Sequence, residues 1–380
     1  MEVIIANARN TRMRSLLGNL LARADITING DREWDFKVHR EDVFARIIAE
    51  GSLGLGESYM DGWWECDQLD EFFHRVLKVR LDKKIPVNLP SILIYLKSSL
   101  LNMQSRQRSG KVARQHYNLG NDFYMSFLDP YNQYTCGYFK QTQDLNIAQE
   151  QKLDLICRKL QLQASDRVLD IGCGWGGFAR YAAEHYGCHV TGITISDEQI
   201  DYARTFCQNL PVNILKKDYR DLNDHYSKIL ICGMIEHVGY KNYPKIMEIV
   251  HRNLDDNGLF LLHTIGGNTS VKYAEPWTSK YIFPNSMIPS ANQLSKAMEG
   301  LFIFEDWHNL GTHYTPTLKS WFANFHRNWD QFSNQYGEKF YRMWKYYLLS
   351  SAGAFKAREL QLWQIVLSKR GVPGGYLSIR

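Results

Sequence analysis

The sequence predicts an α/β protein in two parts, the larger of which holds a parallel sheet with helices on both faces. The chain has 380 residues, which leaves room for one large domain or two ordinary ones. In its second part, short apolar runs alternate with helical stretches, as in parallel sheets. Within that alternation, Arg167–Gly177 (RVLDIGCGWGG) joins a strand carrying an acid to closely spaced glycines and a following helix, which favours a nucleotide-type ligand.

The composition narrows the class of protein. Apolar residues make up 44% of the chain, and the 13% of aromatic residues suits either a cation-stabilising cavity or a thick core. A net charge of +5 permits contact with anionic surfaces without indicating nucleic-acid binding. The seven cysteines form no Cys-x-x-Cys pair, so we expect reduced thiols in a cytoplasmic protein and no metal site. No signal-peptide core or membrane-spanning run is evident, so we expect a soluble or peripheral protein.

The first part of the chain predicts a smaller, mainly helical α+β domain over residues 1–102, followed by a linker over 103–115 and a larger domain over 116–380. A helix is expected at Arg12–Ala24, and a second at Asp42–Glu50 that ends at Gly51. Between them, Ile26–Asp31 and Phe36–His39 are expected to be short strands around an Asn-Gly turn.

Two segments of this part have both a functional and a structural interpretation. Gly51–Asp67 (GSLGLGESYMDGWWECD) could hold a lipid head group, or it could be a structural loop packed by Trp63 and Trp64. Leu89–Leu101 is amphipathic and runs into basic residues up to Arg114. Such a segment can lie on an anionic membrane surface, or it can be a solvated linker.

The second part is expected to follow a βα rhythm. Strands are predicted at Val168–Ile171, His189–Ile193, Val212–Leu215, Lys228–Cys232, Gly258–His263, Phe302–Trp307 and Gln361–Ser368. Helices are predicted at Asn146–Leu160, Phe178–Tyr186, Asp197–Asn209, Tyr243–Asn253 and, long and aromatic, Thr317–Ala357.

Polar residues follow consecutive predicted strands, at the sheet edge where ligands of parallel sheets bind. They are Asp170 with the glycines, Thr194 with Gln199, Asp218 to Arg220, Glu236 with His237, and His263 to Gly266. Each alone could be structural, and the glycines alone could make an ordinary tight turn. Together they predict a ligand site. The glycine spacing differs from that of dinucleotide sites, and no acid follows the second strand, which weakens an NAD interpretation.

Several motifs resemble those of the cyclopropane fatty acid synthases, which are S-adenosylmethionine-dependent enzymes. The motifs are VLDIGCGWGG, GITIS, DYRDL, MIEHVG, FLLHTIG and QYTCGYF, with GSLGLGESYMDGWWECD near the start and KYIFPN and LQLWQ near the end. The resemblance implies a class I methyltransferase fold, Rossmann-like, with a seven-stranded, mostly parallel sheet and helices on both faces. Because the N-terminal part is present, the chain resembles the phospholipid-acting branch more than the shorter mycolic-acid-modifying relatives.

The resemblance also implies ligands. Matched residue by residue, a bound bicarbonate would serve as base and be held by Cys136, Glu236, His263, Ile265 through its backbone, and Tyr314. S-adenosylmethionine would be held by Tyr134, Thr135, Gly172, Gly174, Thr194, Ile195, Gln199, Tyr219 and Arg220, with Asp170 orienting the loop. Either Glu236 is protonated beside bicarbonate, or it pairs with His263 and Tyr314.

Three departures from relatives bear on this assignment. Thr135 stands where serine is common and keeps the hydroxyl, whereas Tyr219 and Arg220 replace a Trp-Glu pair of the mycolic-acid relatives. The adenine contact is therefore expected to differ. Ser351 stands where some relatives carry cysteine, which excludes a covalent thiol mechanism at that position.

The implied function is methylene transfer from S-adenosylmethionine to the cis double bond of unsaturated phospholipid acyl chains, through a carbocation. Two alternatives stay open: methylation that gives methyl-branched acyl lipids, and a catalytically inactive lipid-binding module. The expected partner is phospholipid in a membrane, with no nucleic acid. The expected state is a homodimer in the cytoplasm, peripherally associated with the inner face of the membrane.

Overall fold

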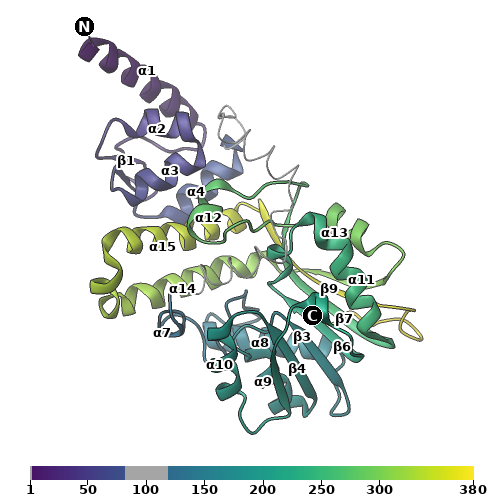
Figure 1. Cartoon of the computed structure of the whole chain (residues 1–380). Coiled ribbons are helices and arrows are strands. Elements are labelled where there is room, and N and C mark those ends of the chain that lie inside the picture. The colour runs from purple at the N-terminus through teal and green to yellow at the C-terminus, as the bar shows by residue number, and fades with distance from the viewer. Residues whose placement is uncertain (1, 82–118) are drawn as a thin grey trace. The chain divides into compact units, whose positions relative to one another are not determined.

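The structure, a computed structural model, describes residues 2–81 and 119–380. The chain forms two compact units (Figure 1). The first comprises Met1–Leu101, Tyr273–Pro284 and Leu318–Leu360, and the second comprises Asn102–Lys272, Asn285–Thr317 and Gln361–Arg380. The first unit thus includes two segments from the C-terminal half of the chain. The whole predicted linker over 103–115 and the amphipathic and basic segment over 89–114 lie outside the described residues.

The second unit is built on a seven-stranded sheet in the order β5-β4-β3-β6-β7-β9-β8. The pairs β3–β4, β4–β5, β3–β6 and β6–β7 are parallel, and β8 runs antiparallel to β9. The expected seven-stranded, mostly parallel sheet is therefore confirmed. The strands are β3 (Arg167–Ile171), β4 (His189–Thr194), β5 (Val212–Lys216), β6 (Tyr226–Cys232), β7 (Leu254–Gly267), β8 (Ile303–Asn309) and β9 (Leu360–Ser368).

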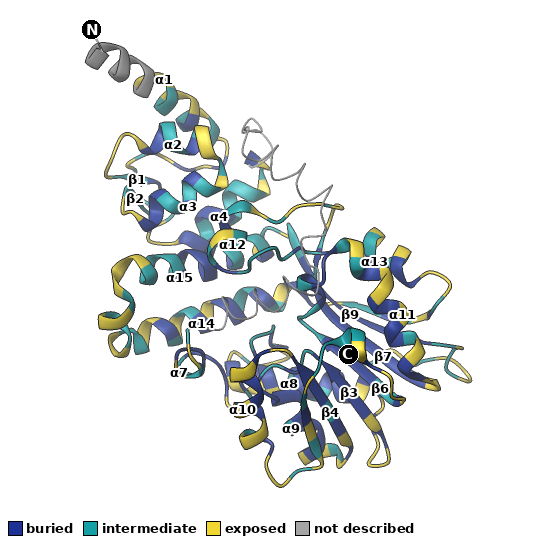
Figure 2. Ribbon diagram, in the orientation of Figure 1, coloured by how far each residue is buried: buried dark blue, intermediate teal, exposed yellow. Residues whose placement is uncertain are grey.

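Helices cover both faces of this sheet because successive strand residues alternate between the faces. On one face, Leu169 and Ile171 pack in a core with α11 (Tyr243–Asn253) and α13 (Ala291–Met298). On the other face, Val168 packs with α8 (Leu145–Lys159) and α9 (Gly177–Tyr186). Figure 2 shows the central strands buried and the outer sides of these helices more exposed.

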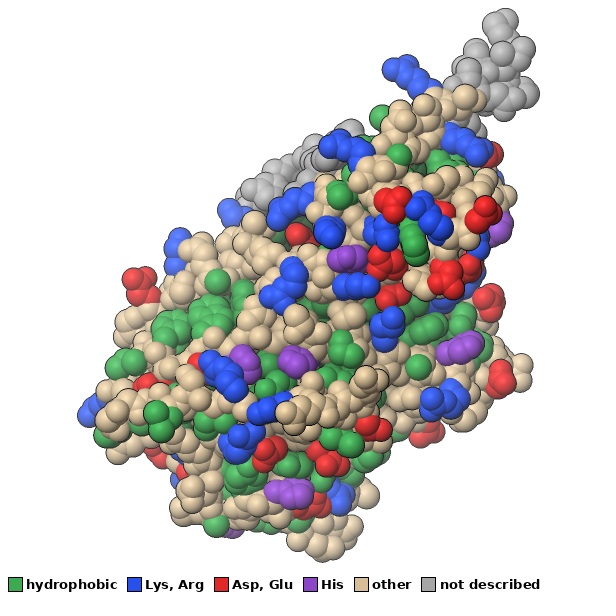
Figure 3. All heavy atoms as spheres, turned by 180° about the vertical axis from the view of Figure 1, so that it is seen from behind, with side chains coloured by type: hydrophobic (Ala, Val, Ile, Leu, Met, Phe, Trp, Pro, Cys, Tyr) green, Lys and Arg blue, Asp and Glu red, His purple; other side chains and the backbone are tan. Residues whose placement is uncertain are grey.

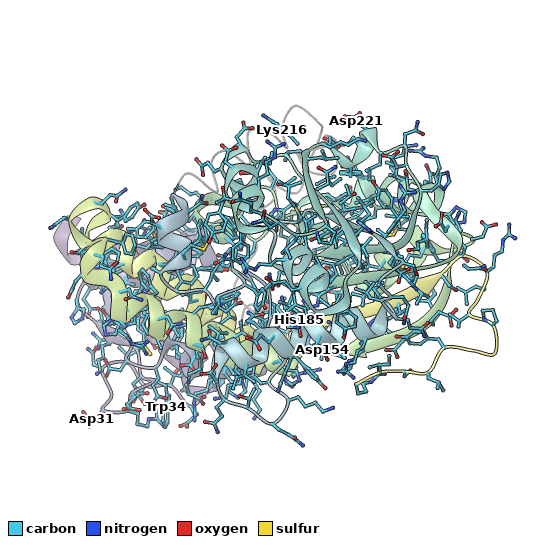
Figure 4. The ribbon with its side chains drawn as sticks, turned by 90° about the horizontal axis from the view of Figure 1, so that it is seen from below. Asp31, Trp34, Asp154, His185, Lys216 and Asp221 are labelled. Carbon is cyan, nitrogen blue, oxygen red and sulfur yellow. The ribbon has the colours of Figure 1, made fainter. Side chains whose placement is uncertain are left out.

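The two helices on the second face are well defined by their ends. The Asp144 carboxylate accepts hydrogen bonds from Asn146 N and Ile147 N and so caps α8. Helix α9 ends at Gly187, whose φ is 68°. The side chain of Tyr186 donates to Asp154 of α8 over 2.7 Å, and Figure 4 labels Asp154 and His185 near one another on these two helices. Helix α10 (Asp197–Phe206) lies between β4 and β5 in the chain, as the alternation predicts.

The first unit contains helices of 6 to 24 residues and a two-stranded sheet. Its helices are α1 (Glu2–Ala22), α2 (Val43–Glu50), α3 (Ser52–Met60), α4 (Leu69–Lys78), α12 (Pro276–Tyr281) and α15 (Ser333–Lys356), together with most of α14 (Tyr314–Asn328). The predicted end of α2 at Gly51 is confirmed. The long helical stretch predicted at 317–357 is two helices, because a 3-10 turn at Trp329–Gln331 interrupts it.

The predicted strand pair around Asn29 is wrong. The strand β1 (Lys37–Val38) pairs instead with β2 (Trp64–Glu65), and only a single bridge joins Ile28 to Phe36. The reason is a buried carboxylate: Asp35 accepts hydrogen bonds from Thr27 N and from the Arg32 side chain, which turns the segment into a compact loop.

The glycine-rich segment at residues 51–67 is a helix followed by a strand, not a loop around a ligand. An added methyl at Gly54 would lie 2.5 Å from Arg46 O, and one at Gly56 would collide with the Trp277 ring. Trp64 is fully buried, and its indole N–H donates to Leu55 O over 3.1 Å. Here the glycines permit close packing within the first unit, which favours the structural interpretation.

Within the described part of the chain, no helix is both long enough and apolar enough to cross a bilayer. On the face drawn in Figure 3, basic and acidic side chains are interspersed rather than gathered by sign.

Candidate functional site

The polar residues predicted at strand ends meet along one edge of the sheet. Because β3, β4, β6 and β7 are parallel and in register, their carboxyl ends lie side by side. Gly172 N donates to Ile193 O over 2.9 Å, and Gly233 N donates to His263 O over 2.9 Å. The strand order reverses between β3 and β6, and such a switch point is where open α/β sheets bind ligands.

The glycine turn after β3 has the shape of a ligand-binding loop. Gly172 has φ 83°, and a methyl group there would lie 2.8 Å from Met234 Cγ. Gly174 has φ 54°, and a methyl group there would meet no atom of the described residues within 4 Å. Among the described residues, the backbone at Gly174 therefore leaves space into which a ligand can approach closely. Helix α9 begins at Gly177, directly after the turn, so its positive end lies beside that space.

The residues after β4 and β5 are held by hydrogen bonds. Thr194 Oγ1 donates to Gln199 Oε1 over 2.9 Å, and both side chains are buried. Ile195 between them is 37% exposed, an unusual position for a large apolar side chain and one that suits contact with a flat ligand. The Arg220 guanidinium pairs with Asp218 and lies 4.7 Å from the centre of the Tyr219 ring.

The Tyr134–Cys136 segment reaches the same edge of the sheet. Thr135 Oγ1 lies 3.8 Å from Cys232 Sγ, and a methyl group on Gly233 would lie 2.7 Å from Thr135 Cγ2. The Tyr134 ring packs 5.4 Å from Tyr124, which in turn lies 5.1 Å from Trp175 of the glycine turn. An aromatic cluster therefore borders the turn.

Glu236 carries a buried oxygen without a protein partner. It lies in a 3-10 turn after β6, and its Oε1 accepts the Ile265 N–H over 2.8 Å. Its Oε2 is buried and makes no hydrogen bond within the described residues. Burial raises the pKa of Glu236, although the Ile265 amide opposes the shift. The Ile265 N–H, predicted to contact bicarbonate, is thus engaged in orienting Glu236.

His263 has a second buried polar atom that makes no hydrogen bond within the described residues. Its Nδ1 lies 3.2 Å from the Gln364 amide nitrogen, whereas Nε2 has no partner among the described residues. With the amide donating to Nδ1, the proton of the neutral ring is on Nε2, which is then a hydrogen-bond donor. Burial holds the pKa of His263 well below its usual value, helped by the charge of Lys152, so the ring stays neutral.

Cys136 and Tyr314 are linked through the first turn of α14. Thr317 Oγ1 lies 3.6 Å from Cys136 Sγ and accepts the Gly137 N–H over 3.1 Å. Tyr314 begins α14 and is 8% exposed. Burial raises the pKa of the Cys136 thiol, so this group is a neutral one rather than a thiolate.

These groups fit a small hydrogen-bonding anion such as bicarbonate. The set is nearly dry and includes two buried polar atoms, Glu236 Oε2 and His263 Nε2, that make no hydrogen bond within the described part of the chain. The structure shows no hydrogen bond that joins Glu236 to His263. The raised pKa of Glu236 shifts its equilibrium toward the protonated form.

The sequence interpretation missed three buried residues that support the site: Lys152, Thr317 and Gln364. Lys152 could have been found, because it falls on the apolar stripe of α8 together with Ala148 and Leu155. Asp170 shares a sheet face with Val168 and hence with α8. Burial raises the pKa of Asp170 to about 7 against the opposing charge of Lys152.

Among the residues described, no cluster of side chains is suited to a metal ion.

Residues 104–365 match the family model described as mycolic acid cyclopropane synthetase. The chain belongs to this cyclopropane synthase family. It is 49% identical over 360 residues, covering 95% of this chain and 94% of the other, to the cyclopropane-fatty-acyl-phospholipid synthase of Escherichia coli (strain K12). It is 35% identical over 286 residues to sphingolipid C9-methyltransferase A of Emericella nidulans, covering 71% of this chain and 55% of that protein.

A solved structure shares the fold of about two thirds of this chain. Mycolic acid cyclopropane synthase CmaA1, complexed with SAH and CTAB, matches with a TM-score of 0.64 and 28% identity, over 68% of this chain and 98% of that one. The resemblance to cyclopropane synthases and the class I methyltransferase fold are both confirmed. The protein is an S-adenosylmethionine-dependent methyltransferase of this family.

The glycine turn gives a prediction for cofactor binding. Gly174→Ala should weaken binding of S-adenosylhomocysteine, measured by calorimetry, by more than about tenfold, because its methyl would enter the space a ligand must occupy. Gly187→Ala is the matched control, since Gly187 has a similar φ of 68° but lies at the far end of α9. Both variants should lose about 1–2 kcal/mol of stability. Equal affinities in the two variants would contradict the assignment of the turn.

Proposed function

We propose that this protein is a cyclopropane fatty acid synthase that transfers a methylene group from S-adenosylmethionine to the cis double bond of unsaturated phospholipid acyl chains. The observation that carries the proposal is a pair of buried polar atoms, on Glu236 and His263, that have no partner among the described residues and lie on the sheet edge that also bears the Gly174 turn. The 49% identity to the Escherichia coli phospholipid synthase, over nearly the whole chain, supports the substrate class.

The reaction explains why such a site is needed. An alkene is a weak nucleophile, so the methyl donor must be an activated sulfonium held against it in a dry site. Methyl transfer leaves a carbocation on the acyl chain, and loss of a proton from the new methyl group closes the ring. A bicarbonate bound beside the acyl chain would supply the base for that proton.

The residues of the chain hold and shield these groups. In the proposal, Glu236 in its protonated form and the Nε2–H of His263 donate hydrogen bonds to the anion, while Cys136 and Tyr314 complete its surroundings and Ile265 orients Glu236. All four side chains are at most 8% exposed, so bulk water is kept from the carbocation that it would trap. Nearby aromatic rings can stabilise a cation by about 2 kcal/mol when desolvated.

For the methyl donor, we assign contacts along the strand ends. Gly172 and Gly174 let the backbone approach, Tyr134 and Thr135 close one side, and the paired Thr194 and Gln199 form the next. Ile195, Tyr219 and Arg220 offer flat apolar and cationic surfaces for the adenine. Asp170 is buried under the loop and orients it.

The N-terminal domain, assigned to residues 1–102, is proposed to engage the lipid surface and to mediate homodimerisation. Similarity to the full-length Escherichia coli relative, which extends over this part, supports a role shared by the two chains. The lipid substrate requires a peripheral contact with a membrane. We place the protein in the cytoplasm, at the inner face of that membrane.

Lipid mass spectrometry of expressing cells tests the proposal. A cyclopropane product adds one CH2 group to an unsaturated acyl chain without leaving a double bond or adding oxygen. The second candidate, acyl methylation, is favoured by the 35% identity to a sphingolipid C9-methyltransferase. It would add a methyl branch with either a retained double bond or two further hydrogens. No new lipid, together with no binding of S-adenosylhomocysteine, would instead indicate an inactive lipid-binding module.

A further inference from the structure

Helix α8 carries a fully buried ammonium group beside the candidate site. Lys152 has no exposed surface, and its Nζ donates to Gln133 Oε1 over 2.5 Å and to Thr135 Oγ1 over 2.8 Å. Both acceptors are uncharged, so these bonds alone compensate only part of the cost of removing an ammonium from water. A lysine in this place therefore needs a reason beyond packing.

Helix α8 makes further hydrogen bonds to the segment that contains Gln133 and Thr135. Gln149 Nε2, one turn before Lys152, donates to Thr135 O over 2.8 Å and to Gln133 O over 3.4 Å. Ala148 O accepts the Tyr138 N–H over 2.8 Å. Residues 133–138 thus run along α8 and are bonded to it by side chains and backbone alike.

This segment carries residues for both proposed ligands. Tyr134 and Thr135 are assigned to the methyl donor, and Cys136 is assigned to the anion. Because the three are consecutive, one displacement of the segment would disturb both ligands together.

We propose that Lys152 is a positioning residue of the active site, whose buried ammonium group fixes residues 133–136 and thereby places the groups that hold the methyl donor and the anion. This inference rests on the proposed function. It explains why α8 has a lysine on its buried side: the long side chain reaches both Gln133 and Thr135, and its amino group has enough donors to bind both at once.

The charges around Lys152 are arranged to keep it in place. Burial lowers the pKa of Lys152, and the buried carboxyl groups of Asp129 and Asp170 oppose that shift. Asp129 also accepts the Gln133 and Tyr131 N–H groups over 2.8 Å each. The same positive charge acts on Cys136 and on His263. A positive charge beneath this edge of the sheet also favours an anion there.

The test compares two buried lysines of one helix. Lys159 is likewise unexposed, but it pairs with Asp306 and His308 rather than with the 133–136 segment. In Lys152→Met, the dissociation constant for S-adenosylhomocysteine should rise at least about tenfold, as expected for loss of a hydrogen bond to a charged group. In Lys159→Met it should stay within about twofold of the wild-type value, even where the melting temperature falls.

A second variant leaves the charge untouched. Gln149→Leu removes both amide bonds to residues 133 and 135, and should raise the same dissociation constant by about threefold or more. If Lys152→Met does not fold, the Gln149→Leu variant tests the positioning role in its place. In each of these two variants that folds, two quantities should rise: the KM for S-adenosylmethionine and the bicarbonate concentration that gives half-maximal rate. Both should rise because one segment serves both ligands.

The outcomes separate the inference from the proposed function. Folded Lys152→Met or Gln149→Leu with wild-type affinity for S-adenosylhomocysteine would overturn the positioning role, while wild-type turnover would still support the function. A loss of affinity in Lys159→Met equal to that in Lys152→Met would also overturn it, because a general loss of stability would then explain both. Absence of cofactor binding by the wild-type protein would instead contradict the proposed function itself.

Discussion

Replacing Glu236 by glutamine should lower turnover by at least about 100-fold, because a positioned base usually contributes that much and Glu236 is proposed to hold the bicarbonate base. Glutamine keeps the size of the side chain and an oxygen that can accept the Ile265 N–H. It cannot gain or lose a proton at the position of Oε2, the buried atom that has no protein partner in the described chain. The chemistry should therefore fail while the architecture stays intact.

Two measurements separate this expectation from a structural effect. The affinity for S-adenosylhomocysteine, measured by calorimetry, should stay within about twofold of the wild-type value, because Glu236 is not among the residues assigned to the methyl donor. Glu248→Gln makes the same chemical change on an exposed part of α11, where Glu248 pairs only weakly with Lys245, and should leave turnover unchanged. Normal turnover in Glu236→Gln would remove Glu236 from proton handling, and a parallel loss of cofactor affinity would point to a collapsed site.

The sequence predicted most of this architecture because its signals are local. Strand β3 is a short, mostly apolar run followed by closely spaced glycines, and α8 and α9 have recognisable ends at Asp144 and Gly187. The strand ends could also be placed on one edge, because parallel strands share their direction. That argument alone brings Thr194, Glu236 and His263 to the same edge, as found.

What escaped prediction depends on contacts between residues distant in sequence. The strand pair around Asn29 follows a common local signal, yet Asp35 turns that segment into a loop and β1 pairs with β2 instead. The support of Cys136 by Thr317 and of His263 by Gln364 joins positions that are more than 100 residues apart. No periodicity or motif records such pairs, and the unpartnered state of Glu236 Oε2 is visible only in three dimensions.

Replacing Asp306 by alanine should destabilise the second unit by about 3–5 kcal/mol, because it leaves a buried lysine without its counter-charge. The Asp306 side chain is 4% exposed and lies 3.5 Å from Nζ of the unexposed Lys159. Arg380 binds the same carboxylate through two nitrogens, at 2.6 and 2.8 Å, and Ser378 donates to it over 3.0 Å. Urea unfolding measures the loss.

The surface of the same unit provides the control. Asp256 pairs with Lys369 and Arg370 but is 55% exposed, so Asp256→Ala should cost no more than about 1 kcal/mol. The double variant Lys159→Met with Asp306→Leu should recover much of the loss seen in Asp306→Ala, because paired apolar groups can replace a buried ion pair. If Asp306→Ala costs no more than Asp256→Ala, the buried pair does not stabilise the fold.

The pH dependence gives an independent check on this ion pair. Burial alone would raise the pKa of Asp306, but hydrogen bonds from Arg380 and Ser378, together with the charge of Lys159, hold it below its usual value. A carboxyl group whose pKa is lower in the folded than in the unfolded state adds stability above its unfolded pKa, near about 4, and loses it as the pH falls through the folded pKa. The difference in unfolding free energy between wild type and Asp306→Ala should therefore be constant near neutral pH and shrink below about pH 4. A difference that grows on acidification would mean that Asp306 is protonated in the folded protein, and that Lys159 is held by His308 instead.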